Sequence, residues 1–366
     1  MARETNKIYL FPHLFLQHEI EFLSASNMKA LVFRYPSGVC AVRIINKRGE
    51  IVVLPFHGQQ VWDAQFDGRR IKMETAVKEP KDTQDFLSNM GGFLFHCGMG
   101  AMGSPGPDDD HPIHGELVNA KYQHAYLEAG SDENGSFIGL GGVYEHSAAF
   151  GNHYTANPTL RLYENESLIN FTLRVKNLNR TPMEYMYLAH INFHPVDMGE
   201  LVYSARYDAD HVRIRANFPS HMQPKEDLLN FVNILVKNPT VHHITHPDHI
   251  YDPEIVFMID YEADDEGWAH ALHIHPDGSA DYVRHRPAQL DHGIRWICRT
   301  PNQQALGMEV GTAGVEGYSA EKNKGNVKVL APGGEFFCEY TSGLVDKLGT
   351  EEIRKKIDTQ MGRNKP

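Results

Sequence analysis

"TLRLYENESLINFTLRVKNLNRTPMEYMYLAHINF" (residues 159–193) contains three successive runs of alternating apolar and polar residues, and this pattern indicates the fold class. Turn-forming sequences separate these runs, "ENES" at 164–167 and "NLNRT" at 177–181. Alternation with a period of two is typical of β-strands that bury one face. We therefore predict three consecutive strands here.

The same alternation continues on both sides of this stretch. Further alternating runs surround four other turn-forming sequences: "NKRGE" (46–50), "DGRR" (67–70), "PDG" (276–278) and "PGG" (332–334). Helical patterns are few, a short one at 83–92 and a terminal one at 350–362 in which acidic residues precede basic ones. Many short strands with few helices predict an all-β fold, a large antiparallel β-sandwich with a few short helices.

The domain organisation follows from the lack of an internal repeat, a low-complexity tract or a linker in the sequence. We predict a single domain over residues 1–366. The strands of residues 1–80 and a C-terminal helix at 349–362 are expected to pack on it.

The composition limits the partners. The chain has 366 residues, 41% of them hydrophobic and 22% charged, and a formal net charge of −12. This acidic balance argues against nucleic acid or an anionic membrane as the partner, because both require a positive face. No apolar run reaches the roughly 18 residues of a membrane span. A small neutral molecule remains the expected ligand, and a homodimer is allowed.

The first residues and the cysteines indicate a compartment. The opening "MARETNKIYLFPHLFLQHEIEF" has no basic segment followed by an apolar core, so we expect no signal peptide. Cys40, Cys97, Cys298 and Cys338 are far apart and form no CxxC pair. We therefore expect neither a disulfide framework nor a structural zinc site of that type, and a cytoplasmic location.

Two histidines interrupt a run that otherwise predicts a buried strand, "MYLAHINFHPV" (186–196). His190 and His194 lie four residues apart and so share one face of that strand. Each is either a core histidine hydrogen-bonded to a neighbour or a group that faces a cleft. We expect His194, at the end of the strand, to line the mouth of a pocket.

A proline-rich and aspartate-rich loop delivers a second pair of histidines in "HPIHGE" (111–116). His114 precedes Gly115, a residue that allows the backbone to approach a ligand closely. The alternative is a polar loop histidine that caps a strand.

An acidic residue follows an apolar run in "ALGMEVGTAGVEGY" (305–318). Burying a lone carboxylate such as that of Glu309 is costly unless it is paired or poised for use. Strand alternation also permits Glu309 to face the surface. If it meets His190 and His114, the three make a general base and general acid at neutral pH.

Such a set moves protons without a nucleophile, a metal or an organic cofactor, and we expect none of these. Opening and closing the ring of a sugar hemiacetal is a reaction of this kind.

Four motifs occur in order along the chain: "HG" (114–115), "VKNLNRTPMEYMYLAHINFHP" (175–195), "GMEVGTAGVEGY" (307–318) and "NVKVLAPGGEFFCEY" (326–340). From about Gly91 to Asp346 the chain thereby resembles the galactose mutarotase-like superfamily of aldose 1-epimerases. The resemblance implies an isomerase that interconverts sugar anomers. It implies that Glu309 is the base on the anomeric hydroxyl, that His190 is the acid at the ring oxygen, and that His114 steadies the developing charge.

The resemblance also implies groups that bind the substrate. The family has an aspartate ahead of the glutamate, and Asp248, Asp252 and Glu254 are the options here. The family's arginine-rich stretch is replaced by "MGGFLFHCGMGAMG" (90–103), which is similar to a divergent, uncharacterised branch. We therefore expect His96 at the substrate, with a guanidinium supplied from elsewhere. The candidates for that guanidinium are Arg69, Arg70 and Arg295.

Two other functions compete with this hypothesis. His273 and His275 form an H-x-H pair on one strand face, a spacing that cupin-type metal enzymes use. A non-catalytic carbohydrate-binding sandwich would instead bind sugars on aromatic platforms. Trp62, Trp268 and Trp296 are the candidates for those platforms.

Overall fold

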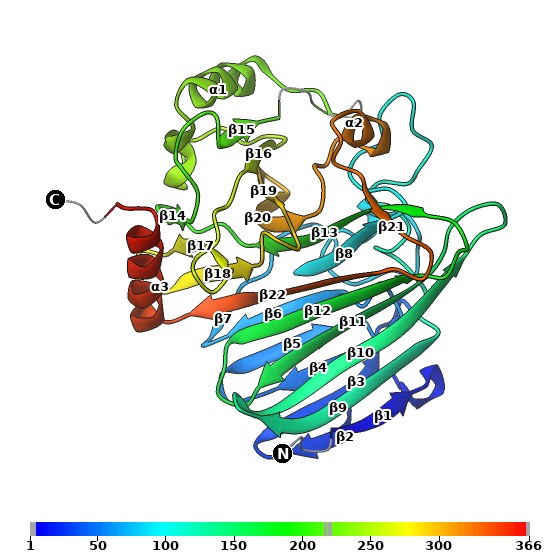
Figure 1. Ribbon diagram of the computed structural model, residues 1–366. Coiled ribbons are helices and arrows are strands. Elements are labelled where there is room, and N and C mark those ends of the chain that lie inside the picture. Colours follow the sequence, from blue (N-terminus) through cyan, green and yellow to red (C-terminus); the bar gives the residue numbers. More distant parts are fainter. Residues whose placement is uncertain (1–4, 216–217, 219–221, 364–366) are drawn as a thin grey trace.

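The computed structural model describes residues 5–215, 218 and 222–363 of the chain (Figure 1). Two large sheets face each other as a sandwich, and every strand pairing among the described residues is antiparallel. The predicted fold class is confirmed.

The smaller sheet has nine strands in the part of the chain described. In spatial order they are β1 (Asn6–Leu10), β9 (His124–Asp132), β10 (Gly135–Ser147), β11 (His153–Tyr163), β12 (Leu168–Asn177), β22 (Glu335–Val345), β18 (Ala280–His285), β17 (Ala269–Ile274) and β14 (Glu200–Tyr203). Figure 1 shows β9 to β12 in front of the first strands of the larger sheet.

The larger sheet follows one path of eleven strands with two short strands attached at its side. The path is β15 (Val212–Ile214), β16 (Ile255–Ile259), β19 (His292–Thr300), β20 (Gln303–Gly311), β13 (Met183–Phe193), β8 (Leu94–Met99), β6 (Val61–Phe66), β5 (Gly49–Val53), β4 (Cys40–Ile45), β3 (Met28–Arg34) and β2 (Ile20–Ala25). The short strands are β21 (Lys328–Leu330), paired with β13, and β7 (Arg69–Arg70), paired with β6.

Six helical elements occur in the described residues. They are the α-helices α1 (Glu226–Lys237), α2 (Tyr318–Asn323) and α3 (Lys347–Gln360), and the 3-10 helices η1 (Pro12–Leu14), η2 (Leu87–Asn89) and η3 (Pro239–His243). None of the helices is both long and apolar enough to cross a membrane. The terminal helix occurs where it is predicted, whereas only η2 forms in the region 83–92.

Strand β13 shows how alternation builds the two sides of the larger sheet. Tyr187, Ile191 and Phe193 belong to the main core between the sheets. Met186 and Leu188, on the opposite face, belong to a second core on the outer side of the sheet. His190 shares this outer face, so its environment is set by whatever covers the sheet there.

Segments outside the strands cover this outer face. Phe86 and Met90 come from the segment around η2, Met102 from the loop after β8, and Val315 from the segment after β20; all four belong to the second core. Because loops form one wall and a rigid sheet the other, this is where a pocket can open.

Two predicted turns do not join paired strands. "PGG" at 332–334 does not close a hairpin, because β21 pairs with β13 in the larger sheet while β22 pairs with β12 and β18 in the smaller one. "NLNRT" likewise carries the chain from one sheet to the other, from β12 to β13. The other predicted turns join adjacent paired strands.

Candidate active site

The register of two neighbouring strands brings the first two candidate residues together. Ala189 of β13 pairs with Val310 of β20, and Asn192 pairs with Gly307, which places His190 opposite Glu309. Both side chains lie on the outer face of the sheet. The Nδ1 atom of His190 lies 3.3 Å from Oε1 of Glu309.

These two atoms face each other without hydrogen-bond geometry. Oε1 of Glu309 and Nδ1 of both His190 and His114 are buried and lack a hydrogen-bond partner among the described residues. Buried polar atoms are nearly always paired in folded proteins. Three unpaired atoms in one place therefore mark a site that a polar ligand would complete.

Burial sets the protonation of the pair. It raises the pKa of the Glu309 carboxyl well above its usual range, and the nearby charge of Glu254 raises it further. Burial lowers the pKa of His190 to about 4. Both shifts disfavour the charged forms, so the pair retains one shared proton over a wide range of pH.

The third group comes from the loop between β8 and β9. The His114 ring lies with its centroid 5.0 Å from that of His190, at an interplanar angle of 80°. The Phe86 ring packs edge-on against His114 at 4.8 Å. Burial holds the pKa of His114 well below its usual range, and the nearby His190 lowers it further.

The backbone of this loop is held in an unusual conformation. His114 has a φ of +61° and Gly115 a φ of +76°. A Cβ at position 115 would lie 2.2 Å from the carbonyl oxygen of Ala101 and 2.5 Å from that of Gly98. The glycine thus allows the loop to pack closely against the segment of residues 98–101.

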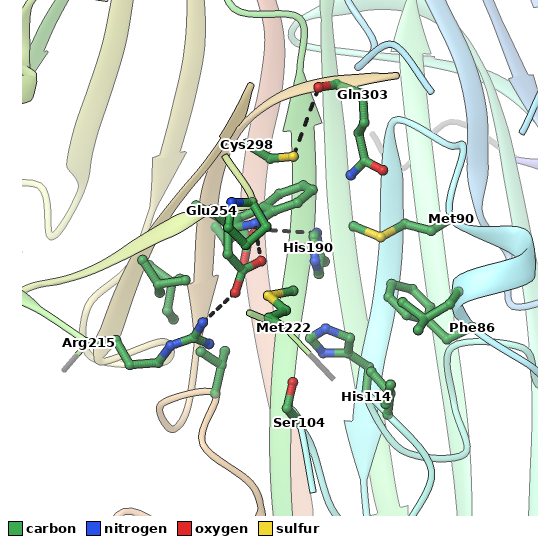
Figure 2. Close-up of a pocket in the computed structure, with 18 of the residues that line it drawn as sticks. Phe86, Met90, Ser104, His114, His190, Arg215, Met222, Glu254, Cys298 and Gln303 are labelled. Atoms are coloured by element: carbon green, nitrogen blue, oxygen red, sulfur yellow. Dashed lines mark hydrogen bonds and ion pairs between the residues drawn. The ribbon is translucent and has the colours of Figure 1, made fainter. Parts of the chain in front are cut away.

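Glu309, His190 and His114 line one pocket of about 280 Å³. Figure 2 shows His190 and His114 in it. Its volume is close to the lower end for small-molecule sites, roughly 300 Å³. Most of its wall is apolar. The apolar lining residues include Phe86, Leu87, Met90, Ile113, Met222, Val256 and Ile294.

A second polar cluster lines the same pocket. The indole Nε1 of Trp296 donates a hydrogen bond of 2.7 Å to Oε2 of Glu254. Arg215 forms an ion pair with the other oxygen of Glu254, and both side chains are buried. Figure 2 shows Arg215 and Glu254 on one side of the pocket and His114 on the other. Glu254 is therefore the only member of the predicted acidic group 248–254 that lines the pocket.

The structure places several other predicted substrate-binding residues elsewhere. His96 points to the opposite face of β8, where its Nδ1 lies 2.7 Å from the hydroxyl of Tyr187 in the core between the sheets. Arg70 is exposed and forms an ion pair with Asp63. Neither lines the pocket, so these two predictions are wrong.

Two further predictions fail. Arg295 is fully buried and packs over the ring of Tyr203, because it lies on the face of β19 opposite to Trp296. Its Nη1 contacts Nε2 of His242 at 3.2 Å. The side chain of Asp248 is 88% exposed beside His246.

His194 does not line the mouth of this pocket. It lies beyond the end of β13, beside a separate depression formed with Arg70, Lys72 and Glu74.

Sequence reasoning missed Arg215 and Gln303 as pocket residues. Arg215 directly follows the short edge strand β15, and its backbone N–H donates to the carbonyl of Val256. Gln303 opens β20, six residues before Glu309 and so on the same strand face. That even spacing was available in the sequence, whereas nothing there indicated Arg215.

Comparison with solved structures identifies the fold. A protein of Klebsiella pneumoniae subsp. pneumoniae MGH 78578, described as a "putative aldose 1-epimerase", superposes with a TM-score of 0.80 at 17% identity, covering 99% of this chain and 97% of its own. A galactose mutarotase-like protein of Clostridium acetobutylicum gives 0.58 at 13% identity, covering 87% and 98%. Galactose 1-epimerase of Lactobacillus acidophilus NCFM gives 0.52 at 12% identity, covering 94% and 99%. At these identities the likeness shows the galactose mutarotase-like fold.

Comparison with curated protein sequences gave no match. One family model, described as "Domain of unknown function (DUF4432)", matches residues 36–342, which is most of the 366-residue chain. The chain therefore belongs to the DUF4432 family, and it carries the galactose mutarotase-like fold.

Proposed function

We propose that this protein is an isomerase that interconverts the anomers of a sugar by opening and closing its ring. The observation that carries the proposal is the convergence of Glu309, His190 and His114, each with an unpaired buried polar atom, in one pocket. The similar proteins described as aldose 1-epimerases share this fold and support the proposal.

The chemistry requires two proton transfers at one carbon. The anomeric hydroxyl and the ring oxygen are both bonded to C1, so a base and an acid that serve them must lie close together. Glu309 and His190 are 3.3 Å apart at their nearest atoms and line the same pocket. In this scheme the proton that the pair shares first moves from Glu309 to His190 across their 3.3 Å contact. Glu309 then removes the proton from the anomeric hydroxyl while His190 donates one to the ring oxygen.

The electrons and protons balance without any added group. As the hydroxyl proton leaves, its oxygen forms the C1 carbonyl and the bond from C1 to the ring oxygen breaks. The ring oxygen takes the proton of His190 and becomes a hydroxyl. Rotation about the C1–C2 bond followed by the reverse transfers closes the ring to either anomer. His114 lies beside His190 and stabilises the charge that develops on the ring oxygen.

The rest of the pocket is suited to hold a sugar in this pose. Glu254 can accept hydrogen bonds from sugar hydroxyls, and Trp296 and Arg215 keep its carboxylate oriented. Phe86 and Met90 provide apolar surface for the C–H faces of the ring. Their presence also excludes water from the groups that transfer protons.

The test is an anomer-exchange assay on a panel of aldoses, deoxysugars and sugar acids, in which saturation-transfer NMR measures the exchange rate. We expect at least one sugar to exchange faster than in buffer, and Glu309→Gln to lower that enhancement at least about 100-fold. Glu316→Gln is the matched control, because Glu316 lies on the same chain segment but outside the pocket. If the wild-type protein binds sugars without accelerating their exchange, it is a carbohydrate-binding protein and not an isomerase.

A further inference from the structure

A second cluster of chemically capable side chains lies in the smaller sheet. His273 lies on β17, His275 directly follows that strand, and Asp281 lies on β18 opposite His273. The side chains of the three residues are 0%, 0% and 2% exposed. Figure 1 shows β17 and β18 beside helix α3. None of the three residues lines the pocket described above.

The three side chains converge on one point. Oδ2 of Asp281 lies 3.1 Å from Nδ1 of His273 and 3.0 Å from Nε2 of His275. One ligand atom from each residue lies within 4.8 Å of the others. Ligands of a tetrahedral zinc ion, with bonds of about 2.0–2.1 Å, are separated by roughly 3.4 Å. The two separations from Oδ2 of Asp281 are therefore close to those of a coordination site, and the two histidine nitrogens lie within 4.8 Å of each other.

The hydrogen bond of His275 to Ser279 fixes its tautomer. We call the ring nitrogen that faces Asp281 the inner nitrogen and the other one the outer nitrogen. The outer nitrogen of His275, Nδ1, lies 3.1 Å from Oγ of Ser279. The Ser279 hydroxyl donates its only hydrogen to the carboxylate of Asp277, at 2.6 Å. A carboxylate only accepts, so Nδ1 of His275 must be the donor to Ser279. In a neutral imidazole the inner nitrogen then carries a lone pair directed at Asp281.

The outer nitrogen of His273 is fixed in the same way. Its Nε2 lies 3.3 Å from Oγ1 of Thr245. The Thr245 hydroxyl donates to the backbone carbonyl of Val196, and the carbonyl of Gly199 lies 3.1 Å away as a second acceptor. Nε2 of His273 therefore donates to Thr245, and Nδ1 presents a lone pair to Asp281.

Two nitrogen lone pairs and a carboxylate oxygen thus meet in a buried space. Protonating both inner nitrogens would place two imidazolium ions around one carboxylate, with a net positive charge removed from water. One divalent metal ion satisfies all three donors at once. The hydrogen bonds to Ser279 and Thr245 are the outer contacts that orient metal-binding histidines and fix their tautomers.

We propose that His273, His275 and Asp281 bind one divalent transition-metal ion of the zinc class. The set of two imidazoles and one carboxylate suits zinc. The site ties the β17–β18 hairpin to the segments that carry Thr245 and Val196. It is independent of the proposed sugar chemistry, and it departs from the sequence-based expectation that the chain holds no metal.

The experiment uses full-length protein. Because a buried site exchanges metal slowly, the metal is removed and added through unfolding and refolding. The chain is unfolded in denaturant with a chelator, freed of both, and refolded with or without one equivalent of Co²⁺ or Zn²⁺. After gel filtration, bound metal is measured, the visible d–d absorption of Co²⁺ is recorded, and thermal unfolding is followed. His273→Gln and Asp281→Asn remove ligands. His270→Gln is the matched control, a buried histidine on the same strand that pairs with Asp264.

We expect about one Co²⁺ per chain in wild type and in His270→Gln, and a thermal midpoint at least about 3 °C higher with zinc than without. His273→Gln and Asp281→Asn should each bind less than about a tenth of the Co²⁺ that wild type binds. If wild type itself refolds without retaining metal and shows the same midpoint with and without zinc, the proposal is overturned, whether or not the variants fold. Undiminished Co²⁺ binding by folded ligand variants would also overturn it.

Discussion

Gly307 has no side chain that could transfer a proton and does not line the pocket, yet its lack of a side chain leaves room for the carboxylate of Glu309. It precedes Glu309 by two residues on the same strand face, and a Cβ there would lie 2.3 Å from Oε1 of Glu309. The Cβ of Trp296 would be only 3.0 Å away on the other side. The carboxylate therefore lies over the glycine and is positioned by it.

Gly307→Ala should accordingly lower anomer exchange without unfolding the protein. The flexible Glu309 side chain can move aside, but a displacement of about 1 Å at a reacting group costs on the order of 10²-fold in rate. Exchange NMR and thermal unfolding measure the two effects separately. Gly349→Ala is the control, because a methyl group there meets no atom closer than 3.4 Å. Wild-type exchange in Gly307→Ala would show that the carboxylate needs no such position.

The pH dependence of exchange follows from the shared proton of Glu309 and His190. The active pair holds one proton, so activity falls when a second proton binds and when the last one leaves. Burial lowers the pKa of His190 to about 4, which moves the acidic limb down. Burial also raises the pKa of Glu309, which moves the alkaline limb up.

We therefore expect a broad profile that keeps its activity through pH 6.5, the ordinary histidine pKa, and falls only near pH 4 on the acidic side. The limbs belong to the coupled pair and not to either residue alone. Exchange rates measured in buffers across this range give the profile. A loss of half the activity between pH 6 and 7 would contradict the assignment.

Among the strands, the sequence predicted elements better than it predicted partners. Alternation correctly located the strands around "NKRGE", "DGRR" and "PDG", because a period of two and a turn sequence are local properties. "PGG" looked equivalent, yet β21 and β22 belong to different sheets. Sheet membership depends on contacts across the whole chain, and no local pattern encodes it.

Helix α1 was missed although its pattern was present. Leu228, Phe231 and Leu235 are buried at helical spacing, with acidic residues in the first turn and Lys237 in the last. Its β-branched residues Val232, Ile234 and Val236 alternate along the chain, a pattern that also favours a strand.

The same limit explains the candidate site. Glu309, His190 and His114 came from the ordered motifs, and the structure brings them together. His96 and Arg295 fail because alternation gives two faces without saying which one carries the pocket. Cys97 and Trp296, their neighbours by one residue, lie on the pocket side.

Helix α3 should support stability without contributing to the site. Its Ile357 is fully buried against the outer face of the smaller sheet, with Leu272 and Tyr282. Ile357→Ala should lower the free energy of unfolding by about 2–4 kcal/mol, as measured by denaturant titration. Leu348→Ala, at a position 72% exposed in the same helix, should change it by less than about 0.5 kcal/mol.

Exchange rates of folded Ile357→Ala should equal those of wild type. A rate loss as large as that of Glu309→Gln would mean that the smaller sheet positions the catalytic groups, which lie on the larger one.

Over the whole molecule, the main hydrophobic core and the candidate active site lie on opposite faces of the larger sheet. The main core lies between the two sheets, and the pocket opens on the far side of the larger sheet under loops. The formal charge of −12 suits a neutral or weakly charged ligand that enters without electrostatic steering. Under the proposed function, changes to the loops would alter which sugar is accepted, while β13 and β20 keep Glu309 and His190 in register.

We expect Glu309 and His190 to act as one unit in proton transfer, and a double-mutant comparison measures that coupling. Anomer exchange of the best substrate is measured by NMR for wild type, Glu309→Gln, His190→Asn and the double variant. Thermal unfolding checks that each variant folds like wild type. Each single variant should lose about 100-fold or more, and the double variant little beyond that. Exchange at the wild-type rate in either folded single variant would show that Glu309 and His190 do not transfer protons as a unit.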